Sequence, residues 1–177
     1  MRWLAFVIIC VGIGGCAAIG PASSPEFPKL VAESLPPDAT DVVFSGPGEW
    51  APGSRGFTDV RNLSIGPPPS PRPGVLVVTT NSVFFEEWDS PMKRFVPILR
   101  IRFPDLMDAY VDTLGAGARL VLQNMSLTFN SFDFTDSAGL FVDATKVKDA
   151  GAYISDCVKQ LATRFGPDRS AYSCTKR

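Results

Sequence analysis

The chain has 177 residues, of which 45% are apolar and 13 are Phe, so it is long and apolar enough to form one ordinary domain with a core. Lys and Arg total 17 against 18 Asp and Glu, a balance that offers no electrostatic basis for binding nucleic acid. The sequence contains no His, so the usual general base at neutral pH and the commonest zinc ligand are both missing. We therefore expect no catalytic residue, no metal and no cofactor.

The N-terminus carries an apolar segment. Arg2 precedes an apolar run over residues 3–13, and the small residues Gly14 and Gly15 then lead to Cys16. A positive start, an apolar stretch and small residues at its end are typical of a signal peptide. Residues 3–20 also contain no charge and reach roughly the 18 residues that can span a bilayer, so an uncleaved transmembrane anchor and ordinary secretion are the alternatives.

The four residues Ile13-Gly14-Gly15-Cys16 resemble the lipobox of bacterial lipoproteins. The resemblance implies that residues 1–15 are removed as a signal peptide and that the Cys16 thiol receives diacylglycerol. Gly14 departs from the usual Ala, Ser or Thr. Because Ala17 rather than Asp follows the Cys, enteric-type sorting would place the protein in the outer membrane, facing the periplasm.

The remaining cysteines predict a disulfide. Cys10 would leave with the signal peptide and Cys16 would be lipidated, which leaves Cys157 and Cys174. An exported chain meets an oxidising compartment, where such a pair is expected to bond. Two free thiols in a cytoplasmic chain are the alternative.

Residues 16–40 are rich in proline, at positions 21, 25, 28, 36 and 37. We interpret this segment as an extended tether between the lipid and a domain that spans residues 41–177. A short helix over 27–35, or packing of that stretch on the domain, is the alternative.

From residue 41 onward the pattern changes to short runs typical of strands. They cover residues 42–44, 57–65, 75–80, 83–88, 98–103, 119–123 and 127–134. In residues 98–103, Leu99, Ile101 and Phe103 share one face, which predicts a half-buried strand. The polar residues 79–82 between two apolar runs predict a hairpin. The proline-rich residues 66–74 predict a stiff loop outside the sheet interior, with a polyproline ligand as the alternative.

The last predicted element is an amphipathic helix from about residue 144 to residue 165. Its apolar positions recur at spacings of four and three. They are Val147, Gly151, Ile154, Val158, Leu161 and Phe165. Gly166 and Pro167 are expected to end the helix.

About seven strands followed by one helix predict a mainly β (α+β) fold, with a bent antiparallel sheet or small open barrel and a C-terminal capping helix. The segments "GVLVVTTNSVFFEEW", "ILRIRFPDLMDAYVDTLGAGARLVLQ" and "FNSFDF", with the helix, resemble the pleckstrin-homology or GRAM-like superfold over residues 41–165. Residues 104–114 fit a strand in that family, although they also fit a helical period. Phosphoinositide binding is not implied, because the expected first loop, residues 46–56, offers only Arg55 against Glu49.

Three groups of residues are candidate sites. Lys93, Arg94, Arg100 and Arg102 resemble an anion site, but a solvated strand face that pairs with Glu86, Glu87 and Asp89 is the preferred interpretation. The adjacent Glu86 and Glu87 would point to opposite faces of a strand and are interpreted as solvated edge charges. Trp50 and Trp88 are interpreted as covers of the core, with exposed contact residues as the alternative.

The sequence thus predicts a non-enzymatic, membrane-tethered lipoprotein of the cell envelope, anchored by Cys16. Its domain is expected to act as an interaction or structural module toward an envelope protein whose identity the sequence does not give. A carrier that holds a small apolar ligand or lipid in the mouth of the sheet is the alternative. An enzyme that uses paired carboxylates or a metal is a third, less favoured hypothesis.

Overall fold

The computed structural model describes residues 19–57, 70–163 and 173–174. These residues form one antiparallel seven-stranded sheet in the order β4-β3-β2-β1-β7-β6-β5, with a helix at each end of the described chain. The strands span β1 Val42–Pro52, β2 Arg72–Thr79, β3 Ser82–Asp89, β4 Arg94–Arg102, β5 Leu106–Leu114, β6 Gly117–Asn124 and β7 Phe129–Phe134. The helices are α1 Phe27–Ser34 and α2 Ala144–Ala162, and a short 3-10 turn, η2 Phe103–Asp105, joins β4 to β5.

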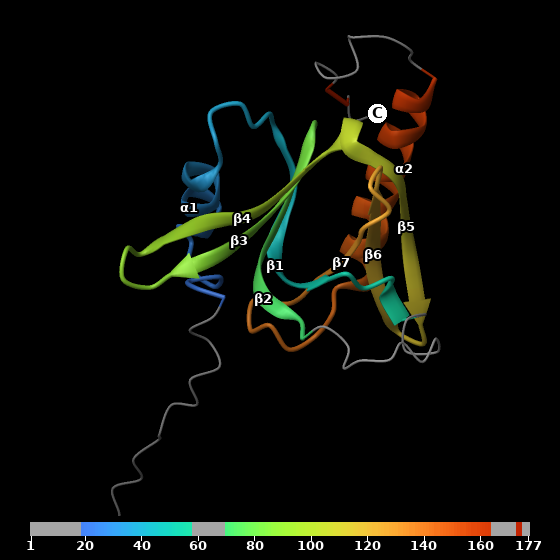
Figure 1. Ribbon diagram of the computed structural model, residues 1–177. Coiled ribbons are helices and arrows are strands. Elements are labelled where there is room, and N and C mark those ends of the chain that lie inside the picture. Colours follow the sequence, from blue (N-terminus) through green and yellow to red (C-terminus); the bar gives the residue numbers. More distant parts are fainter. Residues whose placement is uncertain (1–18, 58–69, 164–172, 175–177) are drawn as a thin grey trace, which may run out of the picture.

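Strand β1 holds the two halves of the sheet together. It pairs with β2 from Val42 to Trp50 and with β7 from Gly48 to Pro52, so that β1–β4 and β5–β7 diverge from this shared strand (Figure 1). Gly48 allows the approach to β7, because a Cβ at this position would collide with the backbone oxygen of Asp133. The strands β4 and β5 are the two edges, so the sheet is open. The predicted mainly β fold with a C-terminal helix is confirmed.

The main core fills the concave side of the bent sheet. Side chains from all parts of the sheet meet those of α2 there, and the largest are fully buried. They include Phe85, Phe103, Leu106, Leu120, Phe132, Phe134, Ile154 and Leu161. The apolar stripe of α2 packs mainly on β5, β6 and β7, with Gly151 against Val111 and Leu120. The predicted capping helix is thus confirmed through Leu161, while Phe165, Gly166 and Pro167 lie outside the described residues.

A second apolar cluster lies on the opposite face of β2 and β3. It joins Val75, Val77 and Phe84 of these strands to Phe27 and Val31 of α1. The continuous apolar runs of β2 and β3 follow from this arrangement, since neighbouring residues of a strand point to opposite faces and both faces are covered. Helix α1 is the element that covers the second face (Figure 1).

Several predicted boundaries are wrong. Residues 46–52 belong to β1 rather than to a first loop, and residues 72–74 of the proline-rich stretch begin β2. Pro73 is tolerated there because it pairs only with Glu49 of β1, whereas the pairing of β2 with β3 starts at Val75. The segment 104–114, left open between strand and helix, is chiefly strand β5. Most of the expected strand 57–65 lies outside the described residues.

Other local predictions are confirmed. Thr79 and Ser82 close the β2–β3 hairpin, where the Thr79 side chain accepts a hydrogen bond from the Ser82 N–H at 3.0 Å. In β4 and the turn after it, Ile101 and Phe103 are buried and the flanking arginines are exposed. Cys157 of α2 and Cys174 form a disulfide with 5.7 Å between their Cα atoms, as the cysteine count predicts.

Candidate functional site

The chain docks on the domain from the first described residue. Ile19 is only 7% exposed and lies against Gly139, where an added Cβ would collide with the Ile19 Cδ1 atom. Gly20 lies on the indole of Trp88, which in turn packs on Phe95 with 5.0 Å between ring centroids. Figure 1 shows the start of the described chain, in blue, beside the orange segment that connects β7 to α2.

The expected extended tether is therefore wrong for residues 19–35. Phe27 packs edge-on against Phe95 with 5.7 Å between ring centroids, and Val31 is 1% exposed. Prolines favour extended chain, but here Pro28 occupies the first turn of α1, where its missing N–H costs nothing. The expected lipidation site, Cys16, lies outside the described residues, only three positions before Ile19.

The segment that joins β7 to α2, residues 135–143, presents an apolar tip. We call it the β7–α2 loop. Leu140 is 73% exposed and Phe141 is 72% exposed, and Val142 beside them is also exposed. The Asp136 carboxylate accepts the Leu140 N–H at 2.8 Å, and the Asp136 N–H donates to the Phe141 carbonyl at 2.9 Å. The loop is thus folded on itself, with its large apolar side chains turned outward.

A shallow groove of about 410 Å³ lies between the end of α1 and strand β4. Its walls are mainly apolar, with one guanidinium at the rim. It is lined by Ser34, Pro36, Phe84, Pro97, Ile98, Leu99 and Arg100. Ile98 is exposed because β3 and β4 change register between Phe85 and Glu86, so that Leu99 and Pro97 are the paired residues and Ile98 lies between them.

Glu86 lies under α1, next to this groove. Its side chain is 0% exposed, and its Oε1 accepts a hydrogen bond from the Ser34 hydroxyl at 2.7 Å. Its Oε2 has no hydrogen-bond partner among the described residues. Burial raises the pKa of Glu86 to about 7, against the smaller opposing effect of the Ser34 hydrogen bond.

The interpretation of Glu86 as a solvated edge charge is therefore wrong. The period-two pattern carried a signal for its burial, because Phe84, Glu86 and Trp88 occupy one face of β3 and both aromatic neighbours pack in the second cluster. Glu87 does point to the other face, as expected, and pairs with Arg72 at 2.7 Å. The sequence did not predict that α1 covers the face of β3 that carries Glu86.

A second buried carboxylate lies where β1, β6 and β7 meet. Asp133 is 3% exposed; its Oδ1 accepts the Glu49 N–H at 2.9 Å and its Oδ2 lies 3.6 Å from the Arg119 Nε. Burial raises the pKa of Asp133 to about 6, opposed by this backbone hydrogen bond and by Arg119. Both oxygens face groups of the sheet, so Asp133 fastens β1 to β7 where the two halves join.

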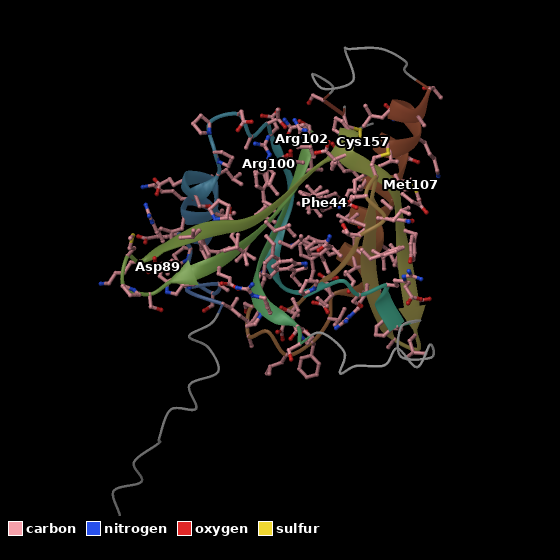
Figure 2. The ribbon with its side chains drawn as sticks, viewed as in Figure 1. Phe44, Asp89, Arg100, Arg102, Met107 and Cys157 are labelled. Carbon is pink, nitrogen blue, oxygen red and sulfur yellow. A yellow bond between two sulfur atoms is a disulfide. The ribbon has the colours of Figure 1, made fainter. Side chains whose placement is uncertain are left out.

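The predicted basic group does not form one site. Lys93 and Arg94 lie at the β3–β4 turn near Asp89, whereas Arg100 and Arg102 lie at the far end of β4 (Figure 2). The solvent-exposed strand face is confirmed, but the expected ion-pair partners are wrong. Arg100 pairs with Asp38 at 2.8 Å and Arg102 pairs with Asp105 at 2.9 Å. These ion pairs link β4 to the segment after α1 and to the η2 turn.

The two tryptophans in the described chain cover apolar clusters, as interpreted. Trp50 packs near Phe85 with 5.8 Å between ring centroids, and its indole N–H donates to the Asn130 side-chain oxygen at 2.9 Å. Trp88 covers the second cluster beside Gly20. Arg55, the one basic residue of the expected first loop, lies over the Phe129 ring at 4.4 Å.

Among residues 19–57, 70–163 and 173–174, no cluster of three potential metal ligands occurs. No helix within this described part is long and apolar enough to span a membrane. A scan of the sequence against protein-family models gives no match, and a search of curated proteins gives none either.

Proposed function

We propose that the chain is a lipid-anchored protein of the bacterial cell envelope, held by Cys16, whose β domain acts as a non-enzymatic interaction or structural module. The observation that carries the proposal is the position of Cys16. It ends the signal-like segment and lies three residues before Ile19, where the chain docks on the domain. Processing at Cys16 would thus remove the apolar segment and leave the folded part intact.

Two structural features suit this proposal. The Cys157–Cys174 disulfide suits an oxidising compartment, and it fixes the end of the described chain to α2. Seven antiparallel strands with a terminal helix also suit the pleckstrin-homology or GRAM-like relationship, which we keep as part of the proposal. A fold of this kind does not itself specify a partner.

Membrane fractionation of cells that express Cys16→Ser tests the anchor. The variant is expected to leave the outer-membrane fraction, either as released protein or as unprocessed precursor. Cys10→Ser is the matched control, because Cys10 would be removed with the signal peptide and its change should leave fractionation unaltered. A Cys16→Ser protein that fractionates like the wild type would contradict the proposal.

A second candidate function, a carrier for a small apolar ligand, is favoured by the groove between α1 and β4. Its volume of about 410 Å³ falls in the range of small-molecule sites. Side chains such as Phe85 and Phe132 fill the inside of the bent sheet, so the groove rather than the sheet interior is the place for a ligand.

Binding of a fluorescent fatty acid distinguishes the two functions. Ile98→Asp should abolish binding if the groove is a ligand site, whereas Met92→Asp, at a 60% exposed position on the β3–β4 turn, should not. Absence of binding by the wild-type protein would leave the interaction module as the better account. The same module is expected to give no turnover with generic esterase, phosphatase and glycosidase substrates.

A further inference from the structure

The docking of Ile19 limits the distance between the proposed anchor and the folded domain. Three residues of chain span at most about 11 Å even when fully extended. The Cα atom of Cys16 must therefore lie within about 11 Å of the Cα atom of Ile19. A protein anchored there could not stand off from the bilayer, and the surface around Ile19 would have to approach the lipid headgroups.

That surface includes the β7–α2 loop. Gly139 is in direct contact with the Ile19 side chain, and the exposed Leu140 and Phe141 follow it at once. Both side chains are large, apolar and more than 70% exposed. Their transfer from water to a hydrocarbon environment is therefore favourable. With the proposed anchor at Cys16, their position next to the point where the chain enters the domain favours lipid as that environment.

The backbone of the loop is also suited to an apolar environment. Polar groups that enter a bilayer without partners are costly, so a membrane-inserting segment must pair its own N–H and carbonyl groups. Here the Leu140 N–H donates to the Asp136 carboxylate, the Gly139 N–H donates to the Asp136 carbonyl, and the Phe141 carbonyl accepts from the Asp136 N–H. Thr135 and Val142 close the base of the loop as a β-bridge.

We propose that the β7–α2 loop is a membrane-contact site, in which Leu140 and Phe141 insert into the bilayer beside the acyl chains on Cys16. The inference rests on the proposed lipid anchor and adds the orientation of the domain. Residues 135–143 contain no Lys or Arg but include Asp136 and Asp143, so the apolar contact is confined to the tip with Leu140 and Phe141 and does not depend on anionic lipid. The loop thereby adds a second attachment that restricts rotation of the domain about its anchor.

Tryptophan quenching by brominated lipids tests this contact. Full-length acylated protein carrying Phe141→Trp is reconstituted in phosphatidylcholine vesicles whose acyl chains are brominated. The matched control is Met107→Trp, at a 46% exposed position of β5 away from the loop (Figure 2). After subtraction of the parental signal, the fluorescence at position 141 should be quenched at least about twofold more than at position 107, because bromine quenches only at close range.

Mass spectrometry of the same preparations separates the two proposals. Acyl mass on Cys16 with equal quenching at positions 141 and 107 would overturn the membrane contact and leave the anchor in place. Absence of acyl mass would overturn the anchor and, with it, the orientation. If detergent-solubilised wild type is a dimer that Phe141→Ser dissociates, the loop is an interface between two copies and the lipid contact is wrong.

Discussion

The two helices of this domain cover apolar surfaces of the same sheet, but they are stabilised in different ways. Helix α2 has 19 residues, an Asp143 cap that accepts the Lys146 N–H at 3.0 Å, and a continuous buried stripe. Helix α1 has 8 residues and no side-chain cap at Glu26. Isolated helices shorter than about 12 residues are marginal in water, so α1 depends on its packing against the sheet.

This difference indicates what each helix contributes. Helix α2 completes the main core, so its loss should unfold the domain. Helix α1 covers the second face of β2 and β3 through Phe27 and Val31, and it places the N-terminal segment on the domain surface. Damage to α1 should therefore open that face and free the chain near the proposed anchor, while the main core persists.

The largest effect is expected for Leu161→Ala in α2. Leu161 is fully buried, and truncation of such a side chain costs about 2–5 kcal/mol through lost burial and a residual cavity. That is a large part of the stability of a domain of this size. Urea denaturation should show a lower midpoint with one transition for all probes. Lys159→Ala on the exposed side of the same helix is the control and should leave the midpoint nearly unchanged.

The pH dependence of stability should report Glu86 beneath α1. Its folded pKa of about 7 exceeds the ordinary value of 4.5, so the folded chain holds the proton more tightly and stability falls as pH rises from 4.5 to 7. At about 1.4 kcal/mol per pH unit, the loss amounts to roughly 3–4 kcal/mol. Glu86→Gln should remove this part of the slope, leaving the smaller contribution of Asp133, whose pKa is raised to about 6.

Urea denaturation of both proteins at pH 5 and pH 8 measures the effect. The free energy of unfolding of the wild type should fall from pH 5 to pH 8 by more than that of Glu86→Gln. Glu87→Gln is the matched control, because the Glu87 side chain is 33% exposed on the opposite face and pairs with Arg72. An identical pH dependence of stability in wild type and Glu86→Gln would contradict the raised pKa of Glu86.

A smaller and more local effect is expected for Val31→Ala in α1. Removal of part of this 1% exposed side chain should cost about 2 kcal/mol. Hydrogen exchange should become faster in α1 and in the segment around Ile19, while protection in α2 changes little. Glu33→Ala on the exposed side of α1 is the control. Equal loss of protection in both helices would contradict the proposed division.

The smallest effect is expected on reduction of the Cys157–Cys174 disulfide. Its 17-residue separation corresponds to about 3 kcal/mol in the chain-entropy model, but we expect about 1 kcal/mol, because other contacts also hold Cys174 in place. After reduction, Cys174 keeps two hydrogen bonds: its N–H donates to the Thr80 carbonyl, and its carbonyl accepts from the Tyr153 hydroxyl. Thermal denaturation with and without reductant should show a modest decrease in Tm; a decrease as large as that of Leu161→Ala would contradict this view.

The sequence predicted α2 and most strands because their periodicity is local. In α2 the spacing of Val147, Ile154 and Leu161 is sufficient to predict an amphipathic helix without knowledge of the rest of the fold. For α1 the sequence favours a spacer over the alternative of a short helix, because the surrounding segment is rich in proline. The helix is stabilised by residues about 45 to 70 positions away, such as Val77 and Phe95. Contacts over such separations carry no local signal.

The same limit applies to the candidate sites. The burial of Glu86 requires α1 above β3, and the exposure of Ile98 requires the register change between β3 and β4. Neither follows from residue type. Arg100 and Arg102 were expected to pair with acidic residues of β3. In the structure they pair instead with Asp38, which follows α1, and with Asp105 of the η2 turn. The sequence therefore predicted the exposure of the β4 arginines, but it predicted neither their ion-pair partners nor the burial of Glu86.

The central claim is that the folded domain begins almost at its lipid anchor. Mass spectrometry of the N-terminal peptide from protein isolated from native membranes tests it most directly. The account predicts that the mature chain begins at Cys16 and carries the added mass of diacylglycerol, often with a further acyl group on the new amine. A membrane-bound chain that retains Met1, or one that begins after Cys16 without acyl mass, would contradict it.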